Sequence, residues 1–362
     1  MRKYMIALAG TILLFASSSW AGAPSERLPK NIILFIGDGM GVAQVSAGKT
    51  VKGTLQLEQC KTAGLLTTHA SDAYVTDSAA GATALAAGIK TYNKAIGVDP
   101  DKKPVKTVLE YAAEKGKATG LVATCTITHA TPACFAAHVD DRNKYNEIAE
   151  QLARSPVDVM LGGGWGYFVP KSQTDSKRED EQDLWAILAK DRTAIRTLEE
   201  FQKLAKPKKL VGLFEAGHLG KADSRTVTLP AMTAKAIEIL AQNKNGFFLM
   251  VEGSQIDWGS HDNNSDYAIM EMVDFDDAIG VGLDFAKKNN ETLIVVTADH
   301  ETGGYSLLGG SVAEKTVTKT AFTTTGHSGV MVPIFAFGPG SEVFGGIHDN
   351  TIVGQKLIEY VK

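Results

Sequence analysis

The chain has 362 residues, of which 44% are hydrophobic and 22% are charged. This composition is typical of a globular protein with a buried core, and it excludes collagen-like, coiled-coil and disordered chains. The 37 basic and 41 acidic residues give a net charge of −4. Because no polybasic run is present, the sequence gives no support for electrostatic nucleic-acid binding.

The first 21 residues have the pattern of a secretory signal peptide. Arg2 and Lys3 form a basic start, and residues 5–16 are an apolar run that is too short for a permanent membrane span. Small residues follow, and we place the cleavage site after Ala21. No later run reaches the length of a membrane span. We therefore predict an exported mature chain, 22–362, that is periplasmic or secreted and does not bind a membrane.

Short apolar runs alternate with helical stretches along the mature chain. In chain order we predict strand 31–36, helix 105–115, strand 118–124, helix 144–154, strand 157–161, helix 229–242, strand 246–251, helix 267–289, strand 293–297 and strand 332–337. Uninterrupted apolar strands are typical of buried parallel strands, and the alternation predicts a doubly wound, mainly parallel α/β sheet flanked by helices. We expect one domain over 22–362, a surface helical insertion over 171–209, and a hairpin or mobile loop over 306–325.

Acidic side chains follow three of the predicted strands. Asp38 follows the first strand, Glu252 ends another, and Asp299 with His300 follows a third. Ligands bind at the carboxyl ends of strands in open α/β sheets. A single acid there is often only a helix cap, but three converging acids repel one another, and a metal cation resolves that repulsion.

Two further patterns add candidate metal ligands. Asp257 and His261 are one helical turn apart, so both side chains can face one ion. His327 lies in a glycine-flanked turn before the last predicted strand. A mixture of imidazole and carboxylate suits zinc, and an oxygen-rich subset suits magnesium. The candidates are too many for one tetrahedral ion, so we expect two or three metals.

The glycine-rich turn at 37–41 has an alternative interpretation as a dinucleotide-binding loop. The third glycine of that motif would fall at Val42, and Asp38 would put a negative charge where a pyrophosphate must lie. The turn therefore fails this test.

Ser78 is the candidate nucleophile. It lies near the start of a predicted helix of small residues, where free N–H groups and the helix dipole attract an anion such as phosphate. The alternative is that Asp77 or Ser78 only caps this helix. The segment is not a G-x-S-x-G elbow, so an ordinary Ser-His-Asp hydrolase is not indicated.

Six motifs resemble those of alkaline phosphatases in identity and order, over nearly all of 31–362. They are NIILFIGDGMG, YVTDSAAGATAL, HATPACFAAHVDDR, MVEGSQIDWGSH, VTADHETGG and TGHSG. The resemblance implies that Ser78 becomes phosphoserine, that Arg142 clamps the phosphate and that Asp77 orients Arg142. It also implies two zinc sites and one magnesium site, with the ligands Asp257, His261 and His327 for the first zinc, Asp38, Asp299 and His300 for the second, and Asp38, Thr131 and Glu252 for magnesium.

Two neighbours of these sites depart from the best-known bacterial members of that family. This chain has His129 where those members have Asp near the magnesium, and Trp258 where they have Lys. We expect both changes to affect the metal preference of the third site and the indirect contacts to phosphate.

The predicted activity is hydrolysis of phosphate monoesters to alcohol and inorganic phosphate at alkaline pH. We expect small monoester substrates, inhibition by inorganic phosphate and, as the family usually shows, a homodimer. The alternatives are a phosphodiesterase of the same superfamily and a non-catalytic phosphate- or metal-binding protein. The cysteines Cys60, Cys125 and Cys134 allow at most one disulfide within the chain, and proximity favours Cys125–Cys134.

Overall fold

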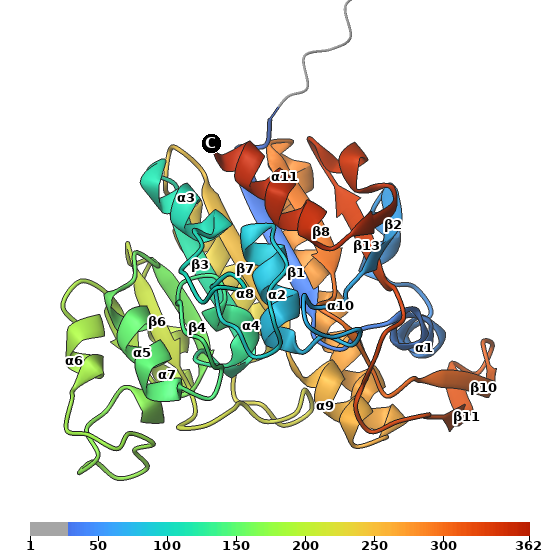
Figure 1. Ribbon diagram of the computed structural model, residues 1–362, viewed down its shortest axis with the longest axis horizontal. Coiled ribbons are helices and arrows are strands. Elements are labelled where there is room, and N and C mark those ends of the chain that lie inside the picture. The colour runs from blue at the N-terminus through green and yellow to red at the C-terminus, as the bar shows by residue number, and fades with distance from the viewer. Residues whose placement is uncertain (1–27) are drawn as a thin grey trace, which may run out of the picture.

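A ten-stranded sheet is the centre of the computed structural model, which describes residues 28–362 (Figure 1). The predicted signal peptide therefore lies outside the described residues. The strand order is β14-β2-β13-β8-β1-β7-β3-β4-β6-β5. In chain order the strands are β1 (Asn31–Gly37), β2 (Thr62–Thr67), β3 (Ala118–Thr126), β4 (Val159–Gly163), β5 (Thr193–Ile195), β6 (Leu210–Leu213), β7 (Phe247–Gly253), β8 (Thr292–Thr297), β13 (Val332–Phe337) and β14 (Gly346–Asp349).

Helices cover both faces of this sheet. Helices α8 and α10 pack on one face, and α2, α3, α4 and α11 lie on the other (Figure 1). The helices are α1 (Val42–Lys52), α2 (Ser78–Ala87), α3 (Val108–Glu114), α4 (Ala130–Ala133), α5 (Tyr145–Arg154), α6 (Leu184–Leu188), α7 (Leu198–Lys203), α8 (Leu229–Leu240), α9 (Gln255–His261), α10 (Ser265–Asn289) and α11 (Thr351–Val361). Three short 3-10 turns complete the set, at Gln56–Gln59, Trp165–Tyr167 and Ser341–Phe344. Among residues 28–362, no helix combines the length and the apolar content that crossing a membrane requires.

The central strands are buried on both faces, which explains their uninterrupted apolar sequence. Every residue of β1, β3, β7 and β8 is buried. Burial of this apolar surface between two helical layers is the main favourable contribution to folding. Several helices begin at a residue whose side chain caps them. Thr107 and Glu110 form a reciprocal capping box at the start of α3, and Asn264 accepts a hydrogen bond from the Tyr267 N–H at the start of α10.

The predicted doubly wound α/β class is confirmed. The predicted parallel direction of one strand is wrong. All six predicted strands are present, and β1 pairs in parallel with both β7 and β8. The strand predicted at 332–337 is β13, which runs antiparallel to both of its neighbours, β8 and β2. A buried strand has the same apolar sequence whichever way it runs, so the local pattern did not encode this direction.

The remaining segments extend the sheet or stand apart from it. Strands β10 (Ser306–Ser311) and β11 (Thr316–Ala321) form an antiparallel hairpin within the segment predicted as a hairpin or loop. The segment 171–209 contains α6, β5 and α7, and β5 pairs with β6 at the edge of the central sheet. The division of the chain into a signal peptide and one domain stays a prediction.

Candidate active site

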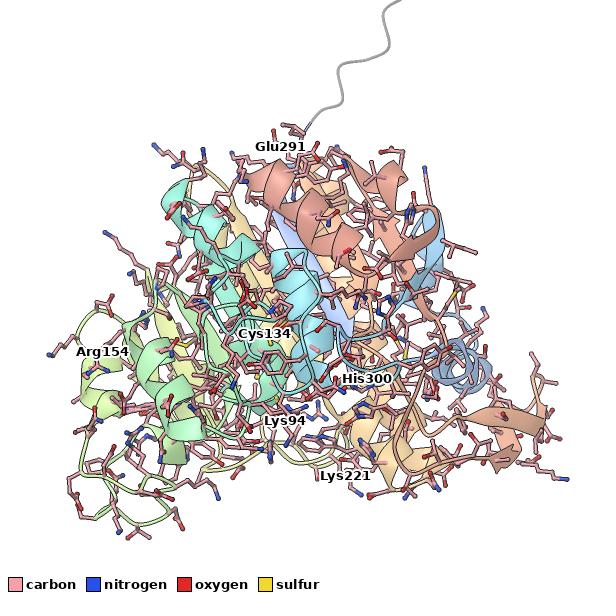
Figure 2. All side chains as sticks on the ribbon, in the orientation of Figure 1. Lys94, Cys134, Arg154, Lys221, Glu291 and His300 are labelled. Atoms are coloured by element: carbon pink, nitrogen blue, oxygen red, sulfur yellow. The ribbon has the colours of Figure 1, made fainter. Side chains whose placement is uncertain are left out.

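The carboxyl ends of four adjacent strands, β8, β1, β7 and β3, bring the candidate residues together. Ile36 near the end of β1 pairs with Glu252 on one side and with Thr297 on the other. Asp38 and Asp299 each follow their strand by one or two residues. His300 therefore lies below the ends of the central strands, at the base of α2, whereas Glu291 lies at the opposite edge of the sheet (Figure 2).

The first group of possible metal ligands contains Asp257, His261 and His327. Helix α9 places Asp257 and His261 one turn apart, with His261 Nε2 3.2 Å from Asp257 Oδ1. His327 comes from β12 (His327–Ser328), which pairs with β9 (Glu301–Thr302), and its Nε2 is 3.2 Å from His261 Nε2. The Nδ1 atoms of His261 and His327 bond the carbonyl oxygens of Thr325 and Thr76. Both Nε2 atoms are thereby left to face an ion.

The second group contains Asp38, Asp299 and His300, all fully buried. His300 Nε2 lies 3.4 Å from Asp38 Oδ1 and 3.3 Å from Asp299 Oδ2. Both Asp38 oxygens and Asp299 Oδ2 have no hydrogen-bond partner. Buried polar atoms are almost always satisfied in folded proteins, so these unpaired oxygens indicate a cation between them.

The third group contains Cys125, His129 and Glu252, at the ends of β3 and β7. Thr131, the other predicted ligand here, is fully buried at the start of the short helix α4. Glu252 Oε1, His129 Nδ1 and Thr131 Oγ1 all lack a hydrogen-bond partner. The third group, like the second, therefore has buried polar atoms without hydrogen-bond partners.

Ser78 is the first residue of α2 and is 2% exposed. Its Oγ lies 3.2 Å from His300 Nε2. Close approach of α2 to the metal groups requires glycine at position 81, because a Cβ there would lie 2.9 Å from the Asp299 carbonyl oxygen. The serine hydroxyl therefore lies beside the second group and at the positive end of the helix dipole.

Asp77 caps α2 and holds Arg142. Its carboxylate accepts hydrogen bonds from the N–H groups of Ala80 and Lys94, and Arg142 Nη1 donates to Asp77 Oδ2 at 3.2 Å. Arg142 Nη2 lies 3.2 Å from His129 Nε2. The guanidinium is thus fixed next to the N-terminus of the helix that carries Ser78, where it can bind an anion.

The site residue Trp258 lies next to Asp257 on α9. Its ring makes edge-to-face contacts with His129 and His218, at centroid distances of 6.3 Å and 4.7 Å. It therefore contributes an apolar wall to the third group.

Burial and mutual repulsion shift the ionisation of this site. Burial, followed by repulsion from Asp257 and Glu252, raises the pKa of Asp299 to about 8. Burial raises the pKa of Glu252 to about 7, and burial with repulsion from Asp299 raises that of Asp38. Burial, and then the nearby His327 and Arg142, lowers the pKa of His300, so its ring is neutral and can donate a lone pair.

These shifts predict how the metal-free protein responds to pH. A carboxyl whose pKa is raised by folding stays protonated in the folded state at pH values where the unfolded chain has lost that proton. The folded state then binds more protons, so the free energy of unfolding falls as the pH rises from about 4 to about 8. We expect the melting temperature of chelator-treated protein to fall by about 3–8 °C between pH 5 and pH 8.5, relative to metal-loaded protein.

Calorimetry on matched chelated and reloaded samples measures this difference, because pH effects elsewhere in the chain are common to both. A gap between the two melting temperatures that stays constant across this pH range would contradict the prediction.

Three residues near the site were missed by the sequence interpretation. Thr302 Oγ1 donates to Asp257 Oδ1 at 2.5 Å and lies 3.2 Å from His300 Nδ1, so it links the first and second groups. His218 packs against His129 and accepts a hydrogen bond from the Thr126 N–H. Cys125 belongs to the third group. Thr302 lies inside the motif VTADHETGG, but no ligand or catalytic role was assigned to it, and Cys125 and His218 lie outside the six motifs.

The favoured disulfide between Cys125 and Cys134 is wrong. All three cysteines are free thiols. Cys125 Sγ points to Glu252 Oε2, whereas Cys134 Sγ donates to the Ala79 carbonyl oxygen under α2. The two thiols therefore lie in different environments despite their closeness in sequence.

Comparison with known proteins gives consistent matches. A family model described as alkaline phosphatase matches residues 29–321. Alkaline phosphatase 3 of Bacillus subtilis is 37% identical, over 91% of this chain and 88% of that protein. The structure of alkaline phosphatase from the Antarctic bacterium TAB5 superposes with a TM-score of 0.85 and 44% identity, covering 92% of this chain and 98% of that one. A variant of the TAB5 enzyme, with a histidine replaced by aspartate and magnesium bound in its M3 site, has a TM-score of 0.86 and 42% identity, over 93% and 99% of the two chains.

Proposed function

The chain belongs to the alkaline phosphatase family and is a phosphoric monoester hydrolase, and on that premise we propose that its reaction proceeds through a phosphoserine at Ser78. The observation that carries the proposal is the position of Ser78 Oγ, 3.2 Å from His300 Nε2 at the start of α2. Arg142, held on Asp77, completes an anion site next to that hydroxyl.

The donor sets support two zinc ions. Zinc with nitrogen and oxygen ligands at 2.0–2.1 Å in a tetrahedron separates neighbouring ligand atoms by about 3.3–3.4 Å. The corresponding separation is about 2.9 Å for octahedral magnesium. Distances in the first group are 3.2, 3.2 and 3.6 Å. Within the second group, His300 Nε2 lies 3.3 and 3.4 Å from the two carboxylates, and it lies 3.2 Å from Ser78 Oγ. Asp257, His261 and His327 would hold one zinc, and Asp38, Asp299 and His300 the other.

We propose a third divalent ion at the third site, where the family resemblance gives magnesium with Asp38, Thr131 and Glu252 as its oxygen ligands. The support is the buried, unpaired Glu252 Oε1 and Thr131 Oγ1 and the magnesium in the M3 site of the TAB5 variant. Once bound, the three ions would favour the serine alkoxide, offset the charge on the leaving oxygen and activate a water molecule.

The chain's own residues supply the covalent step and the positioning. Ser78 Oγ loses its proton to solvent and attacks phosphorus, the bond from phosphorus to the ester oxygen breaks, and that oxygen takes a proton from solvent as the alcohol leaves. Water then cleaves the new bond between phosphorus and Ser78 Oγ, which releases inorganic phosphate. Arg142 donates two parallel hydrogen bonds to the non-bridging oxygens in both steps, and Asp77 fixes its orientation.

Steady-state kinetics with a phosphate monoester and a phosphate diester test this function, with metal analysis of the same sample. We expect turnover of the monoester at alkaline pH, inhibition by inorganic phosphate and zinc in the sample. Preferential turnover of the diester would contradict the proposal, and so would saturable phosphate binding without turnover.

We also propose that the protein is exported and that the mature chain forms a homodimer. Export is supported by the signal-peptide pattern of the first 21 residues. N-terminal sequencing of protein recovered from outside the cytoplasm would locate the cleavage site, and light scattering would give the mass of the assembly.

His129 is expected to weaken the preference of the third site for magnesium. Magnesium prefers an oxygen shell that includes several waters, and an imidazole adds no negative charge beside those waters. Of the chain's histidines, His129 is the one grouped with Glu252, so we take it as the counterpart of the histidine replaced in the TAB5 variant. We expect His129→Asp to bind magnesium at least about tenfold more tightly, as changes next to metal ligands commonly do.

The measurement is a titration of magnesium into metal-stripped, zinc-reconstituted protein, for the wild type and for His129→Asp. His218→Asn, which changes a neighbouring ring outside the donor group, is the matched control. Equal magnesium affinity in wild type and His129→Asp would show that His129 only packs beside Thr131.

A further inference from the structure

The third group contains a thiol that the family motifs do not mark. Cys125 is fully buried at the end of β3, and its Sγ lies 3.3 Å from Glu252 Oε2. Ligand atoms of Cys125, His129 and Glu252 all lie within 4.8 Å of one another. A sulfur, a nitrogen and an oxygen thus converge on one small buried volume.

We propose that Cys125 binds the third metal ion as a thiolate, together with Glu252 and His129. The site then takes zinc, or another divalent ion that accepts sulfur, in preference to magnesium. The inference rests on the proposed function only in that an ion occupies this pocket; it changes which residues hold the ion and which ion it is.

The separation of sulfur and oxygen in this group fits a zinc ion with mixed ligands. Zinc–sulfur and zinc–oxygen bonds of about 2.3 Å and 2.0 Å, at a tetrahedral angle, separate sulfur from oxygen by about 3.5 Å. The observed distance from Cys125 Sγ to Glu252 Oε2 is 3.3 Å. Glu252 Oε1 and His129 Nδ1 are also buried without partners, so the pocket offers unused donor atoms beyond the thiol.

Chemical preference separates zinc from magnesium in this pocket. Magnesium is bound almost entirely by oxygen, whereas a thiolate and an imidazole are ligands that zinc prefers. The thiol must lose its proton to bind, and that proton passes to solvent as the metal enters.

Ligation by His129 has a consequence for Arg142. A neutral imidazole carries one N–H and one lone pair. In the structure His129 Nε2 faces Arg142 Nη2, which can only donate, so the lone pair lies on Nε2. Binding a metal through Nδ1 moves the N–H to Nε2 and removes that hydrogen bond. Arg142 is then held by Asp77 alone and is free to rotate toward phosphate.

Cys134 provides a matched control for Cys125. It is also a free and fully buried cysteine, under α2 (Figure 2). Its contacts are the Ala79 carbonyl oxygen at 3.2 Å and Thr83 Oγ1 at 3.3 Å. Cys134 belongs to none of the possible metal groups found among residues 28–362.

The experiment replaces the metals of the full-length protein with cobalt(II) and records its near-ultraviolet absorption, in which a thiolate bound to cobalt gives a charge-transfer band. We expect this band in the wild type and in Cys134→Ala when the third equivalent of cobalt binds. It should be lost in both Cys125→Ser and Cys125→Ala. With zinc and magnesium in competition, the Cys125 variants should retain the third zinc at least about tenfold less tightly than Cys134→Ala.

If wild-type protein that holds three cobalt ions lacks this band, the inference is overturned, whether or not the variants fold. A band that survives in either Cys125 variant would also overturn it. Monoester hydrolysis by zinc-loaded protein from the same preparation separates this result from the proposed function: activity without the band refutes thiolate ligation alone. A band without activity refutes the phosphatase mechanism alone.

Discussion

Replacing Ser78 with alanine is expected to lower kcat by about 10³- to 10⁵-fold, because the covalent route then disappears. Residual activity should remain, since water can attack a phosphate ester that the metals and Arg142 still hold. The hydroxyl of Ser78 is nearly inaccessible and its hydrogen-bond contact is with the His300 ring. Its removal should therefore leave the fold intact.

The direct measurement is to trap the enzyme with substrate at acidic pH and locate phosphate on a peptide by mass spectrometry. We expect phosphate on Ser78 in the wild type and none in Ser78→Ala. Ser341→Ala, a buried serine beyond the end of β13, is the control and should retain the trapped phosphate. Phosphate on any other residue would contradict the assignment of the nucleophile.

Replacing Arg142 with alanine is expected to lower kcat/KM by about 10- to 1000-fold, because each charge-assisted hydrogen bond to phosphate is worth roughly 1.5–3 kcal/mol. Inhibition by inorganic phosphate should weaken in parallel, since product and substrate share this contact. Arg142→Lys should recover little of the loss, because a point charge cannot replace two parallel N–H groups. It also cannot reach Asp77 and phosphate with the same fixed geometry.

The control is Arg154→Ala, which removes an arginine whose guanidinium bonds the Glu150 carbonyl oxygen on α5, far from the strand ends (Figure 2). Steady-state kinetics with phosphate as a competitive inhibitor give both quantities for each variant. If Arg142→Ala matches the wild type in kcat/KM and in phosphate inhibition, another cation binds the phosphate.

The central strands could be predicted from the sequence because each is recognisable from its own residues alone. A strand buried on both faces must be apolar throughout, so β1, β3, β7 and β8 could be recognised one at a time. The shorter strands β2, β5, β6 and β14 were missed, since each has only three to six residues and all but β6 are partly exposed. The reversed direction of β13 was also beyond a local pattern.

By itself, the sequence determined the α/β class, the acids at the strand ends, the ligand spacing within α9 and, through its motifs, the family. Each of these depends on residues adjacent in the chain or one helical turn apart. The tertiary structure alone decided which distant side chains meet. The order β8-β1-β7-β3 brings Asp299, Asp38, Glu252 and Cys125 to one edge, and the pairing of β12 with β9 brings His327 to Thr302. The tertiary structure also decided that the Cys125 thiol contacts Glu252 and that the Cys134 thiol contacts the Ala79 carbonyl oxygen. The pairing of neighbouring strands fixes the direction of a side chain, and closeness in sequence does not.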